Sequence, residues 1–258
     1  MCLLFSKFKA QEFDQFCQLL CSVFETTPEQ LAELYQDIDD KFDQPGWPLH
    51  FVRRDFFKSV NEEFCFTYQK SPVIAVDLPS LMELDDGRID KPTVAIVGQD
   101  SKNDRNHEHL VVGTPYGLHH KGSREDLPRT KLYFEMIQVL LNLGYRVYLT
   151  DLLKIWVCNP DRPYNGINLP EEDKQRFLKL IKLELDIVKP VAVITWGKFA
   201  NDGVGKLPLN IEHLKFIHPS GAANGAFKRF TGESPTYSNK LNYWRREIIK
   251  RLPGQFNV

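Results

Sequence analysis

The sequence has few of the features that mark metal-binding, disulfide-bonded or membrane-spanning proteins. Its five cysteines are odd in number and include no CxxC pair, so a disulfide framework, a zinc site or an iron–sulfur cluster has little support. No run of about 18 apolar residues is present, which argues against a transmembrane helix. The first residues, MCLLFSKFKAQEF, lack a basic segment and a small-residue cleavage site, and therefore do not resemble a signal peptide. We expect a cytoplasmic protein with no metal and no organic cofactor.

Charged residues are distributed unevenly, although the net charge of the chain is only −1. Residues 1–50 carry three Lys/Arg and nine Asp/Glu, a net charge of −6. Residues 206–251 carry nine Lys/Arg and three Asp/Glu, a net charge of +6. A basic C-terminal region has the sign expected of a surface that binds the phosphate backbone of a nucleic acid. A solvated charged face explains the same composition, and charge alone favours that simpler interpretation.

The first third of the chain has a mainly helical pattern. Apolar positions recur at helical spacing over residues 10–42, where Thr27-Pro28-Glu29 suits a helix cap and first turn, and two helices are predicted there. A further helix is predicted over residues 54–65. Residues 71–92 are predicted to be irregular because three prolines interrupt them.

From residue 93 onward, short apolar runs alternate with amphipathic helical patterns. The runs are VAIV (94–97), RVYL (146–149), VAVIT (191–195) and LKFI (214–217), and the helical patterns cover about 128–143, 170–188 and 238–251. This alternation predicts an α/β fold, a three-layer sandwich in which helices flank a central, mainly parallel four-stranded sheet. We expect residues 91–258 to form this domain, with residues 1–90 as an N-terminal helical extension packed on it.

Polar residues follow each predicted strand at the edge where open parallel sheets bind ligands. Asp100 follows the first strand, Asp151 the second, Lys198 the third and His218 the fourth. Two carboxylates and a histidine are thus predicted to meet at one edge. Capping a helix or forming a turn is the commoner role for an aspartate, and this alternative stays open.

Four segments, in chain order, resemble motifs of the uracil-DNA glycosylase superfamily. VAIVGQDSKND (94–104) resembles the strand and GQDPYH motif that activates the attacking water, and ITWGKFAN (194–201) resembles an internal strand that ends in LLWGxxA. FIHPSGAANG (216–225) resembles the HPSPLS minor-groove loop, and PYGLHH (115–120) is more weakly similar to AHGLxFS. The resemblance spans residues 93–230, and the N-terminal 90 residues show no match.

The resemblance implies a monofunctional DNA glycosylase, which flips a base and hydrolyses its N-glycosidic bond to leave an abasic site. Asp100 would stabilise the sugar cation and orient the water, and His218 would donate to the carbonyl oxygen of the departing base. The alternatives are a turn-forming Asp100 and an ordinary hydrogen-bonded His218. Further residues expected at the base are Gln99, Lys102, Asn103, His120 and Asp151, and those expected on DNA are Lys198, Ser220, Gly221, Ala222, Asn224, Phe227, Lys228 and Arg229.

Two departures from the family pattern concern the identity of the base. Uracil-specific members place a tyrosine after GQDP that excludes a C5 methyl group, whereas this chain continues with Ser101-Lys102-Asn103, so a C5 substituent would fit. Asp151 replaces an asparagine that reads uracil. An ionised carboxylate only accepts hydrogen bonds, which suits the N4 amino group of cytosine, and a protonated Asp151 would donate to cytosine N3. The alternative is that Asp151 is displaced from the reading position or caps the next turn.

Other departures affect stacking and DNA insertion. His120 replaces the phenylalanine that stacks on the base, and Ala222 falls near the position of a leucine wedge. Either Phe227 or Arg229 would substitute for that wedge, or the substrate is intrinsically easier to flip. The segment between Asp100 and Gly117 is longer than in uracil-specific members. Its polar residues, which would suit a hydrophilic substituent, are Lys102, Arg105, His107 and His109.

The departures together favour a DNA glycosylase for C5-modified cytosine, hydroxymethylated or glucosylated as in certain phage genomes, acting in antiviral defence. A uracil-DNA glycosylase of base-excision repair is one alternative, and a non-catalytic DNA- or nucleotide-binding module of the same fold is another. We expect DNA as the partner of a monomeric protein, with no membrane and no metal involved.

Overall fold

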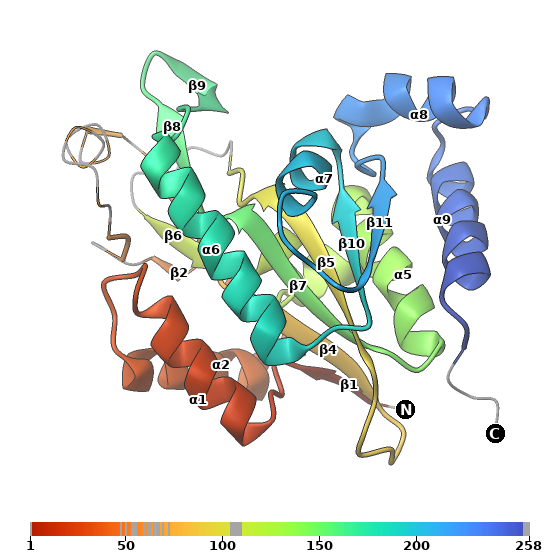
Figure 1. Ribbon diagram of the computed structural model, residues 1–258, viewed down its shortest axis with the longest axis horizontal. Coiled ribbons are helices and arrows are strands. Elements are labelled where there is room, and N and C mark those ends of the chain that lie inside the picture. The colour runs from red at the N-terminus through yellow and green to blue at the C-terminus, as the bar shows by residue number, and fades with distance from the viewer. Residues whose placement is uncertain are drawn as a thin grey trace.

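The structure of the protein is a computed structural model, drawn in Figure 1. It describes residues 2–254 apart from 47, 50, 53–55, 59, 61–62, 64, 66–67, 69, 72 and 104–109.

A six-stranded sheet forms the centre of the molecule. Its four parallel strands lie in the order β7 (Arg146–Leu153), β5 (Thr93–Asp100), β10 (Ala192–Trp196) and β11 (Glu212–Phe216), and they are the four predicted from the sequence. The prediction of only four strands is wrong. The strand β4 (Ser80–Asp85) pairs antiparallel with β7, and β1 (Cys2–Phe5) pairs antiparallel with β4, so the N-terminal region extends the sheet.

The prediction of an irregular segment at residues 71–92 is also wrong, since it contains β3 (Ile74–Asp77) as well as β4. Pro79 lies between these two strands and Pro92 lies directly before β5, so these prolines separate strands rather than interrupt them. The helix predicted over residues 54–65 lies partly outside the described residues. Within it, Phe57 forms an isolated antiparallel bridge with Phe24 instead of a helical turn.

Helices cover both faces of the central sheet. Tyr148 of β7 packs against Phe16 of α1 (Ala10–Leu20), and Thr150 hydrogen-bonds to Glu184 of α6 (Glu171–Val188), which places both helices on one face. On the opposite face, Trp196 packs against α5 (Pro128–Asn142) and α9 (Tyr237–Arg251). Figure 1 shows α6 running across the sheet, with α5 and α9 on the other side of it. The predicted covering of a parallel sheet by helices is confirmed.

The helices begin and end close to the predicted positions. The helix α2 (Pro28–Lys41) begins as expected, because the hydroxyl of Thr27 accepts a hydrogen bond from the Gln30 amide at 3.3 Å. Shorter helices follow several strands: α4 (Lys121–Glu125), α7 (Lys198–Val204) and α8 (Asn224–Thr231), with 3-10 turns η1 (Pro115–Gly117) and η2 (Gly221–Ala223). None of the helices in the described ranges is both long enough and apolar enough to cross a membrane.

A second sheet lies beside the first and has the order β2 (Phe51–Val52), β6 (Val111–Gly113), β3, β8 (Ile155–Asn159), β9 (Arg162–Gly166). The chain passes from β7 to β8 through Lys154 alone, so the two sheets are joined at the carboxyl end of β7. This junction brings Asp77, the last residue of β3, toward the end of the central sheet.

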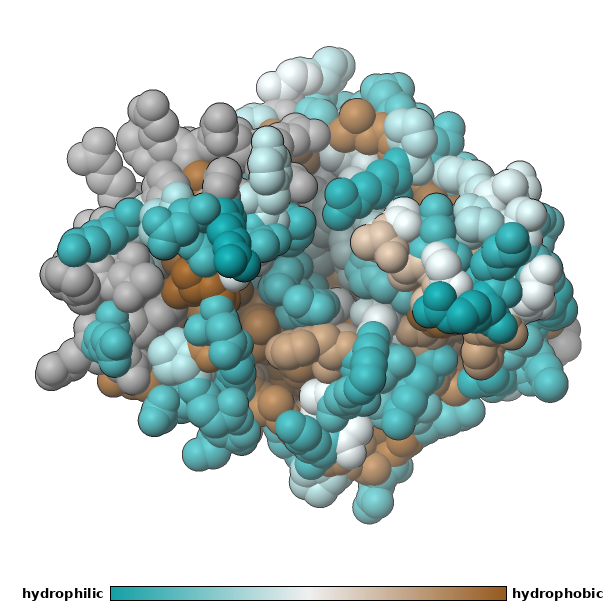
Figure 2. All heavy atoms as spheres, turned by 90° about the horizontal axis from the view of Figure 1, so that it is seen from above, coloured by the Kyte–Doolittle hydropathy of each residue, from teal (hydrophilic) through white to brown (hydrophobic). Residues whose placement is uncertain are grey.

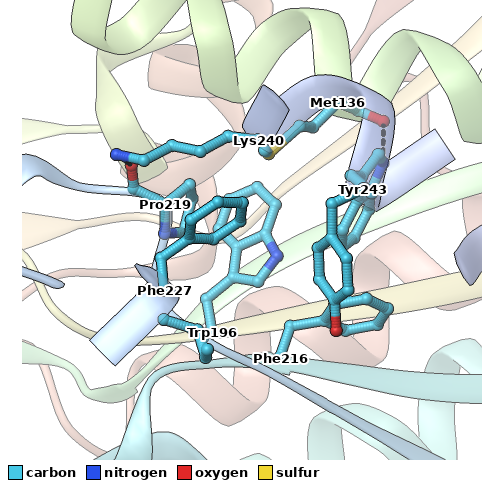
Figure 3. A pocket seen from close by; sticks show the side chains of 9 residues that line it. Met136, Trp196, Phe216, Pro219, Phe227, Lys240 and Tyr243 are labelled. Atoms are coloured by element: carbon cyan, nitrogen blue, oxygen red, sulfur yellow. Dashed lines mark hydrogen bonds between the residues drawn. The ribbon is translucent and has the colours of Figure 1, made fainter. Parts of the chain in front are cut away.

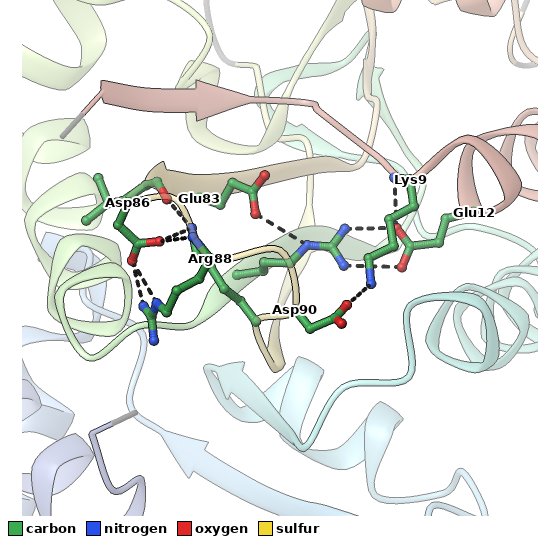
Figure 4. A network of polar contacts seen from close by, with 9 residues as sticks. Lys9, Glu12, Glu83, Asp86, Arg88 and Asp90 are labelled. Carbon is green, nitrogen blue, oxygen red and sulfur yellow. Dashed lines mark hydrogen bonds and ion pairs between the residues drawn. The ribbon is translucent and has the colours of Figure 1, made fainter. Parts of the chain in front are cut away.

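Buried ion pairs fix the N-terminal region to the central sheet. The guanidinium of Arg146, at the start of β7, contacts Glu12 of α1 at 2.8 Å and Glu83 of β4 at 3.7 Å. Figure 4 shows this group beside a second one, in which Lys91 contacts Asp86 at 2.9 Å. One hydrophobic core runs from α1 and α2 through the sheet to α9. The predicted boundary at residue 90 therefore falls within a continuous core.

Candidate active site

Three aspartates from three strands lie together at the carboxyl edge of the sheet. In the register of β5 and β7, Gly98 is paired with Asp151, and Asp100 follows two residues later on the same face. A Cβ atom placed on Gly98 would collide with Asp151 Oδ1 and would lie 2.7 Å from the hydroxyl oxygen of Tyr116. Only glycine fits at position 98, because the Asp151 carboxyl group leans across the end of β5.

Asp100 is half-buried and is held by its neighbours. The side-chain amide of Gln99 donates to Asp100 Oδ2 at 2.9 Å, and the backbone N–H of Lys102 also donates to this carboxylate. Burial raises the pKa of Asp100, and the hydrogen bonds from Gln99 and Lys102 partly offset that rise. The carboxylate thus keeps a fixed orientation at the mouth of the site.

Asp151 is only 2% exposed, and none of the described N–H or O–H groups donates to its Oδ1 atom. Burial, followed by the charge of Asp100, raises the pKa of Asp151 to about 7, while Lys154 opposes the rise. A carboxyl group with this pKa is partly protonated at neutral pH, so it can both donate and accept hydrogen bonds.

Asp77, which the sequence analysis did not single out, lies near enough to Asp151 for the two carboxyl groups to interact electrostatically. Burial is the largest cause that raises the pKa of Asp77 well above its usual value, followed by the charges of Asp151 and Asp100. The nearest signal in the sequence is the position of Asp77 at the end of a short apolar run, IAVD, within a segment predicted to be irregular.

An aromatic wall encloses the carboxyl groups on the side of α5. The ring of Tyr116 packs against Tyr133 at 4.6 Å and against Trp196 at 5.4 Å between centroids. Tyr116 has a φ angle of +61°, a left-handed conformation that is unfavourable for a bulky residue, and its buried hydroxyl has no hydrogen-bond partner among the described residues. Sequence reasoning missed Tyr116 because its importance lies in this conformation and not in a motif.

The segment Ser101-Lys102-Asn103, which follows Asp100, was expected to leave the C5 side of a base open, with Lys102 at the position of the gating tyrosine. The hydroxyl of Ser101 donates to the backbone oxygen of Ala75 at 2.8 Å, and its side chain is buried. Asn103 is buried as well, whereas Lys102 is exposed. Arg105, His107 and His109, predicted to contact a base substituent, lie outside the described residues.

His218 follows β11 and lies at the same edge as the aspartates. Its Nδ1 atom accepts a hydrogen bond from the Ser220 amide at 3.1 Å, and its ring meets Tyr133 edge-on at 6.0 Å. Gly197, with a φ angle of +94°, leaves room for this close approach, since a Cβ atom there would lie 3.2 Å from that of His218. Burial, followed by the charges of Arg129 and Lys240, lowers the pKa of His218 to about 4. The ring is therefore neutral at physiological pH and carries its proton on Nε2, as a hydrogen-bond donor.

Lys240 fixes the loop that follows His218, a role that no motif in the sequence indicated. Its ammonium group donates to the backbone oxygen of Pro219 at 2.9 Å and to Asn224 Oδ1 at 2.6 Å. Its aliphatic part lies over a small cavity of about 20 Å³ walled by aromatic residues, among them Phe227 and Tyr243 (Figure 3). Asn224, predicted to contact DNA, thus holds the loop in place.

His120 has a structural contact in addition to its predicted role. Its Nδ1 atom accepts a hydrogen bond from the Ser123 amide at 3.2 Å and so caps α4. The ring is half-buried, and its stacking on a base stays a prediction.

Five of the eight residues predicted to contact DNA are exposed, whereas Ser220 and Asn224 are half-buried and Phe227 is buried. Gly221, Ala222, Lys228 and Arg229 are exposed, and so is Lys198, which pairs with Asp202 one turn along α7. The prediction that Phe227 inserts into DNA is contradicted, because its side chain is 4% exposed and packs on Tyr243. The exposed aromatic residue of α8 is Phe230, at 70%. Figure 2 looks onto this face and shows a hollow between two raised parts of the surface.

No set of three His, Cys, Asp or Glu side chains in the described part of the chain is arranged to hold a metal ion. A scan of the chain against protein-family models found no match, and a search of curated proteins found no similar sequence.

Proposed function

We propose that the protein is a DNA glycosylase that hydrolyses the N-glycosidic bond of a C5-modified cytosine. The observation that carries the proposal is the meeting of Asp100 and a neutral His218 at one edge of the sheet, with the aromatic wall between them. Tyr133 contacts both Tyr116, which faces the aspartates, and His218.

The two groups have the properties that cleavage of this bond requires. As the bond breaks, positive charge develops on the sugar and negative charge on the base. Asp100 is fixed by Gln99 and Lys102, and its ionised form would stabilise the sugar cation and orient a water molecule. His218 would donate its Nε2 proton in a hydrogen bond to the base carbonyl oxygen, because Nδ1 already accepts from Ser220.

Asp151 and the segment 101–103 support a cytosine with a substituent at C5. A carboxyl group at position 151 accepts from the N4 amino group, and in its protonated form also donates to N3. Ser101, which stands where the resemblance places the proline, turns toward Ala75, and Lys102, which stands where it places the gating tyrosine, is exposed, so no aromatic ring would close the C5 side of the base. The exposed residues Gly221 and Ala222 and the basic side chains of Lys228 and Arg229 would contact the phosphate backbone.

A uracil-DNA glycosylase is the second candidate, and the raised pKa of Asp151 favours it specifically. A protonated carboxyl group presents one donor and one acceptor, as an amide does, and can therefore accept from uracil N3–H and donate to O4. The two bases therefore differ in the groups that meet the protonated carboxyl group. Cytosine would present N3 to its donor and the N4 amino group to its acceptor, and uracil would present O4 to its donor and N3–H to its acceptor.

A cleavage assay with matched oligonucleotides tests both candidates. Each strand carries one uracil, cytosine, hydroxymethylcytosine or glucosylated hydroxymethylcytosine, in single- and double-stranded form, and abasic sites are scored by alkaline cleavage. We expect cleavage at the modified cytosines and its loss in Asp100→Asn. The exposed Asp186→Asn, on α6 and outside the proposed site, serves as a control for an equal change of charge.

The outcomes separate the alternatives. Cleavage at uracil alone would reject the cytosine assignment and keep the glycosylase. Binding of DNA without cleavage of any base, equal in the parent and in Asp100→Asn, would reject the enzyme in favour of a binding module.

A further inference from the structure

The carboxyl group that would read the base is covered in this structure, and Tyr116 lies against it. Asp151 is only 2% exposed, and its Oδ1 atom is buried without a donor among the described residues. This oxygen and the hydroxyl of Tyr116 approach the same point, the position of a Cβ atom on Gly98, from which the hydroxyl oxygen would be 2.7 Å away. A base therefore reaches Asp151 Oδ1 only if a neighbouring group moves.

Tyr116 approaches the carboxyl group from the outer side of the site. The residue as a whole is half-buried and packs on the core, whereas its hydroxyl oxygen is buried. Its side chain thus runs inward from a partly exposed residue and ends beside Asp151. Among the groups around Asp151, this ring is the one whose outward rotation would uncover the carboxyl group from the solvent side.

The backbone that carries Tyr116 is fixed, whereas its ring is held by packing. The hydroxyl of Thr114 accepts from the His119 amide at 3.3 Å and lies 3.0 Å from His119 Nδ1, which closes the turn and keeps Tyr116 at a φ angle of +61°. Strained conformations of this kind are concentrated at ligand sites and switches. The ring packs on Tyr133 and Trp196, but its hydroxyl has no hydrogen-bond partner among the described residues. The hydroxyl would gain a partner on turning outward, which favours displacement by a ligand.

We propose that the side chain of Tyr116 covers Asp151 in the DNA-free protein, and that a flipped base displaces this ring in order to reach the carboxyl group. Tyr116 is then a specificity-determining residue, because only a base that binds well enough to displace the ring meets Asp151. The inference rests on the proposed glycosylase activity and deepens it.

The covering of Asp151 is tested without reference to activity. A water-soluble carbodiimide couples glycine ethyl ester to accessible carboxyl groups, and mass spectrometry of peptides gives the rate at each aspartate. In the parent, Asp151 should react at least about tenfold more slowly than Asp186, whose side chain is 55% exposed. Tyr116→Gly removes the ring and tolerates the positive φ angle, and should make Asp151 react faster. Equal rates at Asp151 in the parent and in Tyr116→Gly would overturn the proposal.

Lys189→Gly is the matched control for this variant. Lys189 is also a non-glycine residue with a positive φ angle, +44°, but it is exposed at the end of α6. The substitution relieves the same kind of backbone strain away from the aspartates, and should leave the labelling of Asp151 as in the parent.

The displacement of the ring is tested by the kinetics of base cleavage. Because the base no longer has to displace the ring, Tyr116→Gly should lower KM for the preferred base by about tenfold, with a much smaller change in kcat. A structural defect would instead lower kcat and leave or raise KM. An unchanged or raised KM in a folded Tyr116→Gly protein overturns the proposal, and Lys189→Gly should match the parent.

A third measurement keeps the tyrosine side chain in place, and decides the matter even if Tyr116→Gly does not fold. Fluorine NMR of 3-fluorotyrosine-labelled Asp100→Asn follows the signal of Tyr116, which is identified by its absence when Tyr116→Phe is added. The signal should shift when a strand carrying hydroxymethylcytosine binds, and should stay unchanged when adenine replaces that base. An unshifted signal in the complex with the modified base overturns the proposal.

The two proposals fail in different ways. If the parent cleaves DNA while the labelling, KM and fluorine signal show no covering ring, Tyr116 loses its role and the glycosylase stays intact. If the parent cleaves none of the four bases, the glycosylase and the entry of a base past Tyr116 both fall.

Discussion

Removing one member of the buried ion pair behind the site should destabilise the protein more than removing both. Lys154 and Glu184 have fully buried side chains, and the ammonium group lies 2.7 Å from Glu184 Oε1. The hydroxyl of Thr150 accepts from Lys154 and donates to Glu184 Oε2 at 2.9 Å. Thr150 and Asp151 are adjacent in β7 and project from opposite faces, so this network supports the strand that carries Asp151.

The expected magnitude follows from the burial of both charges. Lys154→Met leaves the Glu184 carboxylate in apolar surroundings, which costs about 3–5 kcal/mol of unfolding free energy. In a chain of this size, that loss lowers Tm by roughly 6–20 °C. Lys154→Met combined with Glu184→Leu removes both charges, and most of the lost stability should return because an apolar pair of similar volume is often neutral.

Urea and thermal unfolding, followed by circular dichroism at pH 7, measure the unfolding free energy of the parent, the two single variants and the double variant. Lys182→Met, which removes an exposed partner of Asp186 on the same helix, is the matched control and should change stability by less than about 0.5 kcal/mol. The reasoning is refuted if Lys154→Met costs less than about 1 kcal/mol, or if the double variant is less stable than either single one.

Three further changes probe the site and its surface. Burial raises the pKa of Asp151 to about 7 from an ordinary value near 4, so ionisation of Asp151 costs folding stability as pH rises from about 4 through 7. Asp151→Asn should therefore gain stability relative to the parent over this pH range, by up to a few kcal/mol in pH-dependent unfolding, and a constant difference would contradict this. Lys240→Met removes the donor to the loop 219–224, and should speed amide hydrogen exchange there; unchanged exchange would show that the loop does not depend on it. Phe230→Ala should weaken DNA binding in fluorescence anisotropy by about tenfold if this exposed ring stacks on a base, whereas Ile249→Ala, exposed on α9, should not.

The parallel strands of the central sheet could be predicted because each one corresponds to a short apolar run of neighbouring residues. Runs such as VAIV and VAVIT are apolar on both faces, which is the pattern of a strand buried between helices, and the helical periods between them have the expected length. The positions of Asp100, Asp151 and His218 at one edge followed from that alternation alone. The strands β1 and β4 were not predicted, because their pairing depends on partners far away in the chain.

The sequence by itself determined the strand–helix alternation, the helix starts and the residues that follow each parallel strand, since these depend on neighbours within a few positions. Only the tertiary structure decided the protonation chemistry of the site. It brings Asp77 from a second sheet to Asp151, folds Tyr116 against the end of β5, and turns Phe227 inward while Phe230 stays exposed. The physical reason is that a pKa depends on burial and on nearby charges in space, and here those charges come from β3, β5, β7 and α6 together.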